Sequence, residues 1–151
     1  MISIDELMTR NPLTLGPDDS LEQAGKLMKE NRIRHLPIVD EDNMLLGLVT
    51  QRDLLAAAVS ERVNYSTGDV MRRKVYTVER EDNLRVAALM MQKHKIGSLL
   101  VVDEHHLEGI ITDTDYVGLA VTLLEQMEEL EPGEFDLMSE PDDLDSFAED
   151  Y

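Results

Sequence analysis

A short polar motif occurs twice in the sequence, each time directly after a run of apolar residues. Thr50 with Asp53 forms the first copy, and Thr112 with Asp115 forms the second. Each run is too short for a helix, and a new apolar segment opens at the aspartate. The pattern therefore predicts a buried strand that leads into a helix. Threonine at the N-cap and an acid at N3 also make a capping box, which explains both residues without any function.

The same corner could bind a nucleotide. A helix N-terminus presents free N–H groups to an anion, and a carboxylate there can accept hydrogen bonds from the two vicinal hydroxyls of a ribose. The threonine hydroxyl can bond to a phosphate or a sugar oxygen. An adenine ring would also need a dry aliphatic slot, for which the strands offer four side chains: Ile38, Val39, Val101 and Val102. The structural and functional interpretations both stay open.

Basic side chains gather near the first motif. Arg34 and His35 stand at the expected start of a strand, and Arg52 lies inside the motif. The second copy has the small neutral residues 97–98 where the first has Arg34 and His35. We interpret Arg34 and His35 as phosphate contacts. Lys95 has a simpler explanation, because cations suit the C-terminal end of a helix.

Composition and charge exclude several other functions. The chain has no cysteine, which excludes disulfides, thiol catalysis and Cys-based metal sites. The net charge of −18 argues against nucleic acid or an anionic membrane as a partner. The first residues do not form a signal peptide and no apolar run is long enough to span a membrane, so we predict a cytoplasmic protein. Neither a nucleophile motif nor facing carboxylates are present, so we predict no enzyme and no resident metal.

The polar motif belongs to a longer internal duplication. Shifted by 63 residues, Met8, Thr14 and Leu36 meet the same residue types. After a one-residue gap the shift is 62, and the two Thr-x-x-Asp motifs coincide. Each copy predicts the order β-α-β-β-α. The expected elements are strands at 13–15, 36–39 and 45–49 with helices at 21–30 and 53–61, then strands at 76–78, 99–102 and 107–111 with helices at 84–94 and 115–127.

One copy has too few apolar residues to close a core alone. We therefore predict an α+β fold in which tandem β-α-β-β-α repeats pack about a pseudo-twofold axis. The expected boundaries are 1–62 for the first repeat, 63–124 for the second and 125–151 for an acidic tail. Twelve of the 32 acids and none of the 14 Lys and Arg residues lie from residue 125 onward. Such a tail is either a flexible, solvating segment or a short segment that binds a partner.

Taken together, these features resemble the two repeats of a CBS-domain pair, also called a Bateman module. The resemblance rests on residues 8–12, 34–40 and 47–53 with their counterparts at 71, 97–103 and 109–115, and it covers about residues 1–124. It implies two clefts per pair and, often, a flat homodimer of pairs. It also implies binding of an adenosine compound, namely AMP, ADP, ATP or S-adenosylmethionine, with or without Mg²⁺.

The resemblance implies roles for individual residues. Asp53 and Asp115 would hold the ribose. The nearby hydroxyls that assist them would be those of Thr50, Thr112 and Thr114. Arg34 and His35 would meet phosphates, and the backbone of the short strands at Thr14 and Thr77 would border the base. Residues 97–98 depart from the basic pattern, so the cleft that depends on them would bind weakly, bind an uncharged adenosine group or stay empty. The expected ligand-binding residues are Thr14, Arg34, His35, Ile38, Thr50, Arg52, Asp53, Thr77, Ser98, Val101, Thr112, Thr114 and Asp115.

Two functions follow from these features. The first is a stand-alone, non-catalytic sensor, in which an adenosine compound bound between the repeats alters a homodimer that an effector protein then recognises. The alternative is a ligand-free dimeric adaptor, in which both Thr-x-x-Asp motifs are only helix caps and the acidic tail binds the partner.

Overall fold

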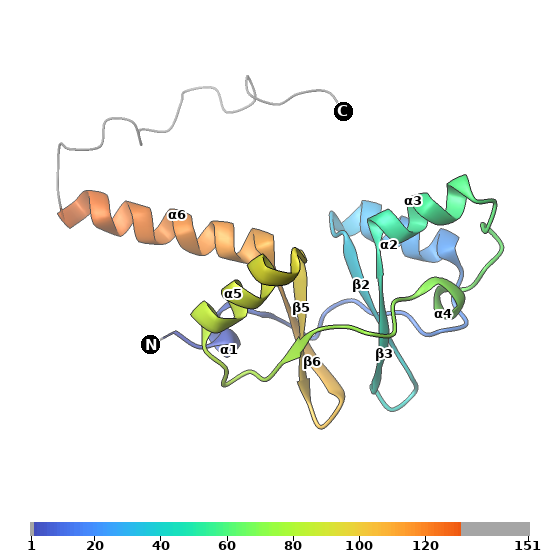
Figure 1. Ribbon diagram of the computed structural model, residues 1–151, viewed down its shortest axis with the longest axis horizontal. Coiled ribbons are helices and arrows are strands. Elements are labelled where there is room, and N and C mark those ends of the chain that lie inside the picture. The colour runs from blue at the N-terminus through green and yellow to red at the C-terminus, as the bar shows by residue number, and fades with distance from the viewer. Residues whose placement is uncertain (1, 131–151) are drawn as a thin grey trace, which may run out of the picture. The chain divides into compact units, whose positions relative to one another are not determined.

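The computed structural model describes residues 2–130 (Figure 1). The chain divides into two units, Met1–Tyr116 and Val117–Tyr151. The first contains every described strand, and the described part of the second is the continuation of one helix. Among the described residues, no helix combines the length and apolarity needed to cross a bilayer. The elements are α1 Ile4–Leu7, β1 Thr9–Arg10, α2 Leu21–Asn31, β2 His35–Val39, β3 Leu45–Thr50, α3 Gln51–Val59, α4 Thr67–Val70, β4 Thr77–Val78, α5 Leu84–His94, β5 Ser98–Asp103, β6 His106–Thr112 and α6 Asp113–Leu130.

The capping residues fix where the helices begin and end. Ser20 Oγ accepts a hydrogen bond from the Gln23 N–H at 3.0 Å, and Gln23 Oε1 accepts one from the Ser20 N–H at 2.9 Å. Asn83 caps α5 in the same position of the second repeat. Both helices then end at a cation in the left-handed region, with φ of 54° at Arg32 and 53° at Lys95. The expected starts of α2 and α5 are therefore confirmed.

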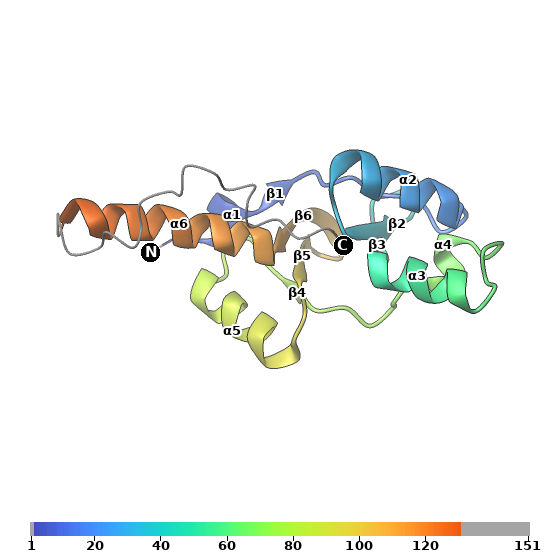
Figure 2. The ribbon, with the colours of Figure 1, turned by 90° about the horizontal axis from the view of Figure 1, so that it is seen from above.

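The strands form two sheets in the first unit. One is the β2–β3 hairpin, and the other has the order β1-β6-β5-β4. Helices α2 and α3 pack side by side against the hairpin, and α5 packs against β5 (Figures 1 and 2). In the hairpin His35 pairs with Thr50, and in the other sheet Ser98 pairs with Thr112. The polar residues of each repeat thus share one end of their sheet.

Each repeat sends its first segment across the other repeat. Thr9 in β1 pairs with β6, and in return the Arg72 N–H and carbonyl bond to Leu48 of β3 at 2.8 and 3.0 Å. A Cβ atom at Gly47 would lie 2.7 Å from the Arg72 carbonyl oxygen, and one at Gly109 would lie 2.8 Å from the Thr9 carbonyl oxygen. The glycine before each polar motif therefore lets the backbone of the other repeat cross close by. Because each repeat is crossed in the same way, the two repeats stand in the expected pseudo-twofold relation.

The buried residues confirm that the repeats share a core. Met71, from the start of the second repeat, packs in a cluster of the first repeat, with Ala24, Met28, Leu36, Ile38 and Val49. A second cluster joins the two sheets and contains Leu48, Leu100, Leu107 and Ile110. Burial of these side chains stabilises the fold only when both repeats are present.

Some predicted elements differ from the structure. The strand predicted at 13–15 is wrong, because Leu15 makes only an isolated bridge with Ile38. Pro12 and Pro17 flank it and lack a backbone N–H, which limits further pairing. The short helices α1 and α4 were not predicted, although each begins with a capping box. Helices α3 and α6 begin at Gln51 and Asp113, two residues before the starts expected at 53 and 115 and directly after the threonine of each motif. For α3 this agrees with the expected N-cap at Thr50. The acidic segment 131–151 lies outside the described residues.

Candidate functional site

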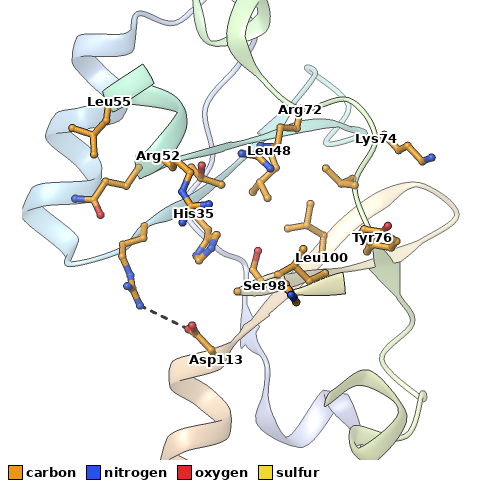
Figure 3. Close-up of a pocket in the computed structure, with 17 residues that line it drawn as sticks. His35, Leu48, Arg52, Leu55, Arg72, Lys74, Tyr76, Ser98, Leu100 and Asp113 are labelled. Atoms are coloured by element: carbon orange, nitrogen blue, oxygen red, sulfur yellow. Dashed lines mark ion pairs between the residues drawn. The ribbon is translucent and has the colours of Figure 1, made fainter. Parts of the chain in front are cut away.

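A cavity of about 500 Å³ lies between the two repeats, within the first unit (Figure 3). Its size suits a small-molecule ligand, since such pockets commonly span roughly 300–1,000 Å³. Side chains from the ends of β2, β3 and β5 line it together with the segment that precedes β4. The lining residues are Arg34, His35, Leu48, Thr50, Gln51, Arg52, Leu55, Arg72, Lys74, Val75, Tyr76, Lys95, Ile96, Gly97, Ser98, Leu100 and Asp113.

The polar part of this cavity is strongly basic. Five of the 14 Lys and Arg residues of an acidic chain line it, and they face a single lining carboxylate, that of Asp113. Arg34 Nη2 lies 3.9 Å from Asp113 Oδ1, which joins the first repeat to the second across the cavity (Figure 3). This ion pair is solvated and contributes little stability. The excess of positive charge makes the cavity a receptor for an anion.

The first polar motif forms one wall of the cavity. Asp53 Oδ2 accepts hydrogen bonds from the Thr50 N–H and Oγ1–H, both at 2.9 Å, so the capping box is present. Asp53 Oδ1 accepts two more from Arg72 Nε and Nη2, both at 3.1 Å. Thr50 and Arg72 line the cavity, whereas Asp53 stands behind them with its side chain 14% exposed. Both carboxylate oxygens of Asp53 are thus engaged by the protein.

The second motif repeats the cap without the arginine. Asp115 Oδ2 accepts hydrogen bonds from the Thr112 N–H at 2.8 Å and from its Oγ1–H at 3.2 Å. The position equivalent to Arg72 is Thr9, whose short side chain carries no charge. Neither Thr112 nor Asp115 lines the cavity, and the two copies of the motif therefore stand in different surroundings.

His35 lies opposite Gly97 inside the cavity. A Cβ atom at Gly97 would lie 3.1 Å from His35 Nε2, so the glycine makes room for the imidazole. Burial lowers the pKa of His35 below its ordinary value; the Asp113 carboxylate partly opposes this shift and Arg34 adds to it. An anion in the cavity would favour the protonated imidazole.

The apolar part of the cavity could hold a planar ring. It consists of Leu48, Leu55, Val75, Ile96 and Leu100, with Tyr76 at its edge. The Tyr76 ring stacks on His94, with ring centroids 4.1 Å apart and planes at 20°. Ile38 and Val101, which were expected to line an adenine slot, are fully buried in the core and are not part of this wall.

The structure gathers part of the predicted set in one place. Five of the residues proposed for ligand binding line the cavity: Arg34, His35, Thr50, Arg52 and Ser98. Eight do not: Thr14, Ile38, Asp53, Thr77, Val101, Thr112, Thr114 and Asp115. Ser98 was assigned to a second cleft, yet it lines the same cavity as His35. The binding roles of all thirteen residues stay predictions.

Sequence reasoning did not select several residues that line the cavity. Arg72, Lys74, Tyr76 and Asp113 were not proposed, and Lys95 was interpreted as a solvated helix end. A comparison of the two repeats could have found Arg72 and Lys74, because the equivalent residues of the first repeat, Thr9 and Asn11, carry no charge. Within residues 2–130 no cluster of three His, Asp or Glu side chains could hold a metal ion.

A comparison with protein families accounts for the repeated architecture. The CBS domain model matches the chain twice, over residues 4–60 and 68–121. These segments cover most of the chain and include both polar motifs. The chain therefore belongs to the CBS domain family, and its α+β fold with two repeats is that of a CBS domain pair.

Several known proteins share this fold. A Vibrio cholerae protein named for acetoin utilization (AcuB) is 46% identical with a TM-score of 0.82, covering 85% of this chain and 98% of its own. The CBS domain pair of MJ0100, solved with 5′-methylthioadenosine and S-adenosyl-L-methionine, is 28% identical with a TM-score of 0.74 over 79% and 99%. CBSX2, solved with AMP, is 28% identical with a TM-score of 0.74 over 82% and 99%.

Some curated relatives are much longer than this chain. The homoserine O-acetyltransferase of Methanocorpusculum labreanum is 35% identical over 112 residues, which are 74% of this chain and 23% of the relative. The matched region is thus about a quarter of that protein, and it corresponds to the CBS repeats.

Proposed function

We propose that this chain is a regulatory module that binds an adenosine compound in the basic cavity and transmits its occupancy to a partner protein. The cavity itself carries the proposal, because it combines an apolar wall, the Thr50 hydroxyl at a helix N-terminus and an excess of cations. Two CBS-pair structures with the same fold hold adenosine compounds, which supports the same ligand class here.

The lining residues suggest how such a ligand would lie. The base would contact the apolar wall near Leu48 and Leu100, and the sugar would approach the Thr50 corner. Phosphate groups would then meet the cations that line the cavity, among them Arg34, Arg72, Lys74 and Lys95. Any Mg²⁺ would arrive on the phosphates of the nucleotide, which supply the oxygen ligands that this ion prefers.

The ion pair between the repeats offers a route for the signal. Arg34 belongs to the first repeat, and its partner Asp113 is the first residue of α6. A bound anion would compete with Asp113 for Arg34 and favour one arrangement of the repeats over another. The ligand can shift that balance only by the difference between its affinities for the two arrangements.

We also propose that the module works as a homodimer. Large apolar side chains are exposed on α3, at Leu55 and Val59, and on α5, at Val86 and Leu89. A second copy of the chain could cover them, and burial of this apolar surface would stabilise the pair. Since Leu55 also lines the cavity, ligand and dimer would be coupled through α3.

Thermal unfolding with adenosine, AMP, ATP and S-adenosylmethionine tests the binding proposal. A ligand at 100 times its Kd adds about 2.7 kcal/mol to the free energy of unfolding. We expect a rise in Tm of about 5–10 °C with at least one of these compounds. No rise with any compound would favour the ligand-free adaptor, an alternative that draws support from the full engagement of Asp53 by its own protein.

The ribose role of Asp53 can be tested separately. Asp53→Asn keeps the shape of the side chain but removes its charge, and it should weaken nucleotide binding if the carboxylate holds the sugar. Asp69→Asn is the matched control, because Asp69 makes the same capping box with Ser66 on α4, outside the cavity. Unchanged affinity in Asp53→Asn would remove the ribose assignment.

A further inference from the structure

The duplication provides an internal comparison for the charge of the cavity. The five cations that line it are Arg34, Arg52, Arg72, Lys74 and Lys95. Their equivalents in the other repeat, in the same order, are Gly97, Thr114, Thr9, Asn11 and Arg32. Four of the five positive charges are therefore absent at the equivalent positions. The fold therefore does not require these four charges, which occur at this cavity and not at the equivalent positions of the other repeat.

Only part of this charge is neutralised by the protein. Arg34 pairs with Asp113 and Arg72 pairs with Asp53. No carboxylate of the described part of the chain forms an ion pair with the other three cations, Arg52, Lys74 and Lys95. With His35 neutral, the cavity and its supporting carboxylates retain three positive charges. An anion of matching charge would be stabilised most.

Arg72 is held in a fixed position at the cavity wall. Its backbone is bonded to Leu48 on the strand that crosses it, and its guanidinium group is bonded through two nitrogens to Asp53. A guanidinium group already held in place loses little side-chain entropy when it binds a phosphate. Lys74 lies two residues further along the same segment and lines the same cavity (Figure 3).

We propose that the cavity selects nucleotides with more than one phosphate, and that Arg72 and Lys74 are the residues that set this preference. The inference rests on the proposed function and narrows its ligand class. A phosphate monoester carries about −1.5 to −2 charges at pH 7, and each added phosphate contributes roughly one more. A nucleoside di- or triphosphate therefore matches the retained charge better than AMP does. S-adenosylmethionine carries a net positive charge and is disfavoured.

Calorimetric titration of the full chain tests this preference. Adenosine, AMP, ATP, S-adenosylmethionine and inorganic tripolyphosphate would be titrated without divalent metal at low and at moderate salt. We expect ATP to bind at least about tenfold more tightly than AMP, a factor that corresponds to about 1.4 kcal/mol. The ratio should fall as salt rises, because exposed charges are screened.

Variants that carry the equivalent residues of the other repeat test which side chains determine the preference for more than one phosphate. Arg72→Thr and Lys74→Asn introduce the residues found at Thr9 and Asn11, and each should reduce the ratio of ATP to AMP affinity by severalfold. Arg73→Ala is the control, because Arg73 is exposed, lies between them and does not line the cavity. Melting followed by circular dichroism shows whether each variant folds. If Arg72→Thr does not fold, Lys74→Asn alone carries the test.

The outcomes separate this inference from the proposed function. Equal affinity for ATP and AMP, tighter binding of S-adenosylmethionine than of ATP, or a ratio that survives in both variants would overturn the inference while leaving adenosine binding in place. If tripolyphosphate bound as tightly as ATP, the selection by charge would be supported and the adenosine proposal would be overturned. Binding of none of these compounds would overturn both.

Discussion

Replacing Gly47 by alanine tests the crossing that places Arg72 at the cavity. The added Cβ atom would lie 2.7 Å from the Arg72 carbonyl oxygen and 2.7 Å from Met71 Sδ. Met71 can change rotamer, but the Arg72 backbone is bonded to Leu48 in both directions and cannot withdraw without loss of those hydrogen bonds. Overpacking of this kind costs about 1–3 kcal/mol.

A smaller effect opposes this cost. Alanine reduces the conformational entropy of the unfolded chain, which is worth about 0.4–1 kcal/mol. We therefore expect Gly47→Ala to lower the free energy of unfolding by about 1–2 kcal/mol, measured by urea denaturation and circular dichroism. Because the carbonyl that must move belongs to Arg72, nucleotide affinity should fall as well.

Gly25→Ala is the matched control. Gly25 lies inside α2, and a Cβ atom there would lie 3.8 Å from Leu54 Cδ1, an ordinary contact. Alanine is favoured over glycine in a helix by up to about 1 kcal/mol, so this variant should be as stable as the original chain or more stable. If Gly47→Ala were no less stable than Gly25→Ala, the close crossing of the two backbones would not constrain the fold.

Two further predictions concern the buried Thr67 and the half-buried His35. The buried Thr67 hydroxyl donates a 2.6 Å hydrogen bond to the Gly16 carbonyl. Thr67→Val removes it and should lower the free energy of unfolding by about 1–3 kcal/mol, measured by urea titration. An unchanged urea midpoint would contradict this prediction. Burial lowers the pKa of His35 in the folded state. Below about pH 6.5 the unfolded state therefore binds more protons than the folded state. The free energy of unfolding should decline there by at most about 1.4 kcal/mol per pH unit. His35→Gln should flatten this decline in melts between about pH 7.5 and 5.5, and an equal decline in both proteins would exclude His35 as its source.

Local signals explain which parts of the fold could be predicted. The starts of α2 and α5 follow from Ser20 and Asn83, whose side chains bond to backbone groups within three residues. The strand expected at 13–15 failed because strand pairing depends on distant partners, and only Leu15 finds one. The repeat itself was visible because the same core positions recur in both copies.

The residues of the candidate site divide in the same way, into those with a local sequence signal and those placed by contacts between distant parts of the chain. Arg34 and His35 could be selected because they stand out within a strand start. Arg72 and Lys74 reach the cavity only because the second repeat crosses β3 at Gly47, a contact between residues far apart in the chain. Periodicity within one repeat carries no information about that crossing. A comparison of charge between equivalent positions of the repeats would have revealed both residues.

Photoaffinity labelling with an azidoadenine nucleotide tests the central claim most directly. The full chain would be irradiated with the probe, with and without excess ATP, and the labelled peptides mapped by mass spectrometry. Binding of the base against the apolar wall predicts labels within residues 75–76 or 96–100, and it predicts that ATP suppresses them. Labels confined to other segments, or labelling that excess ATP does not reduce, would contradict nucleotide binding in this cavity.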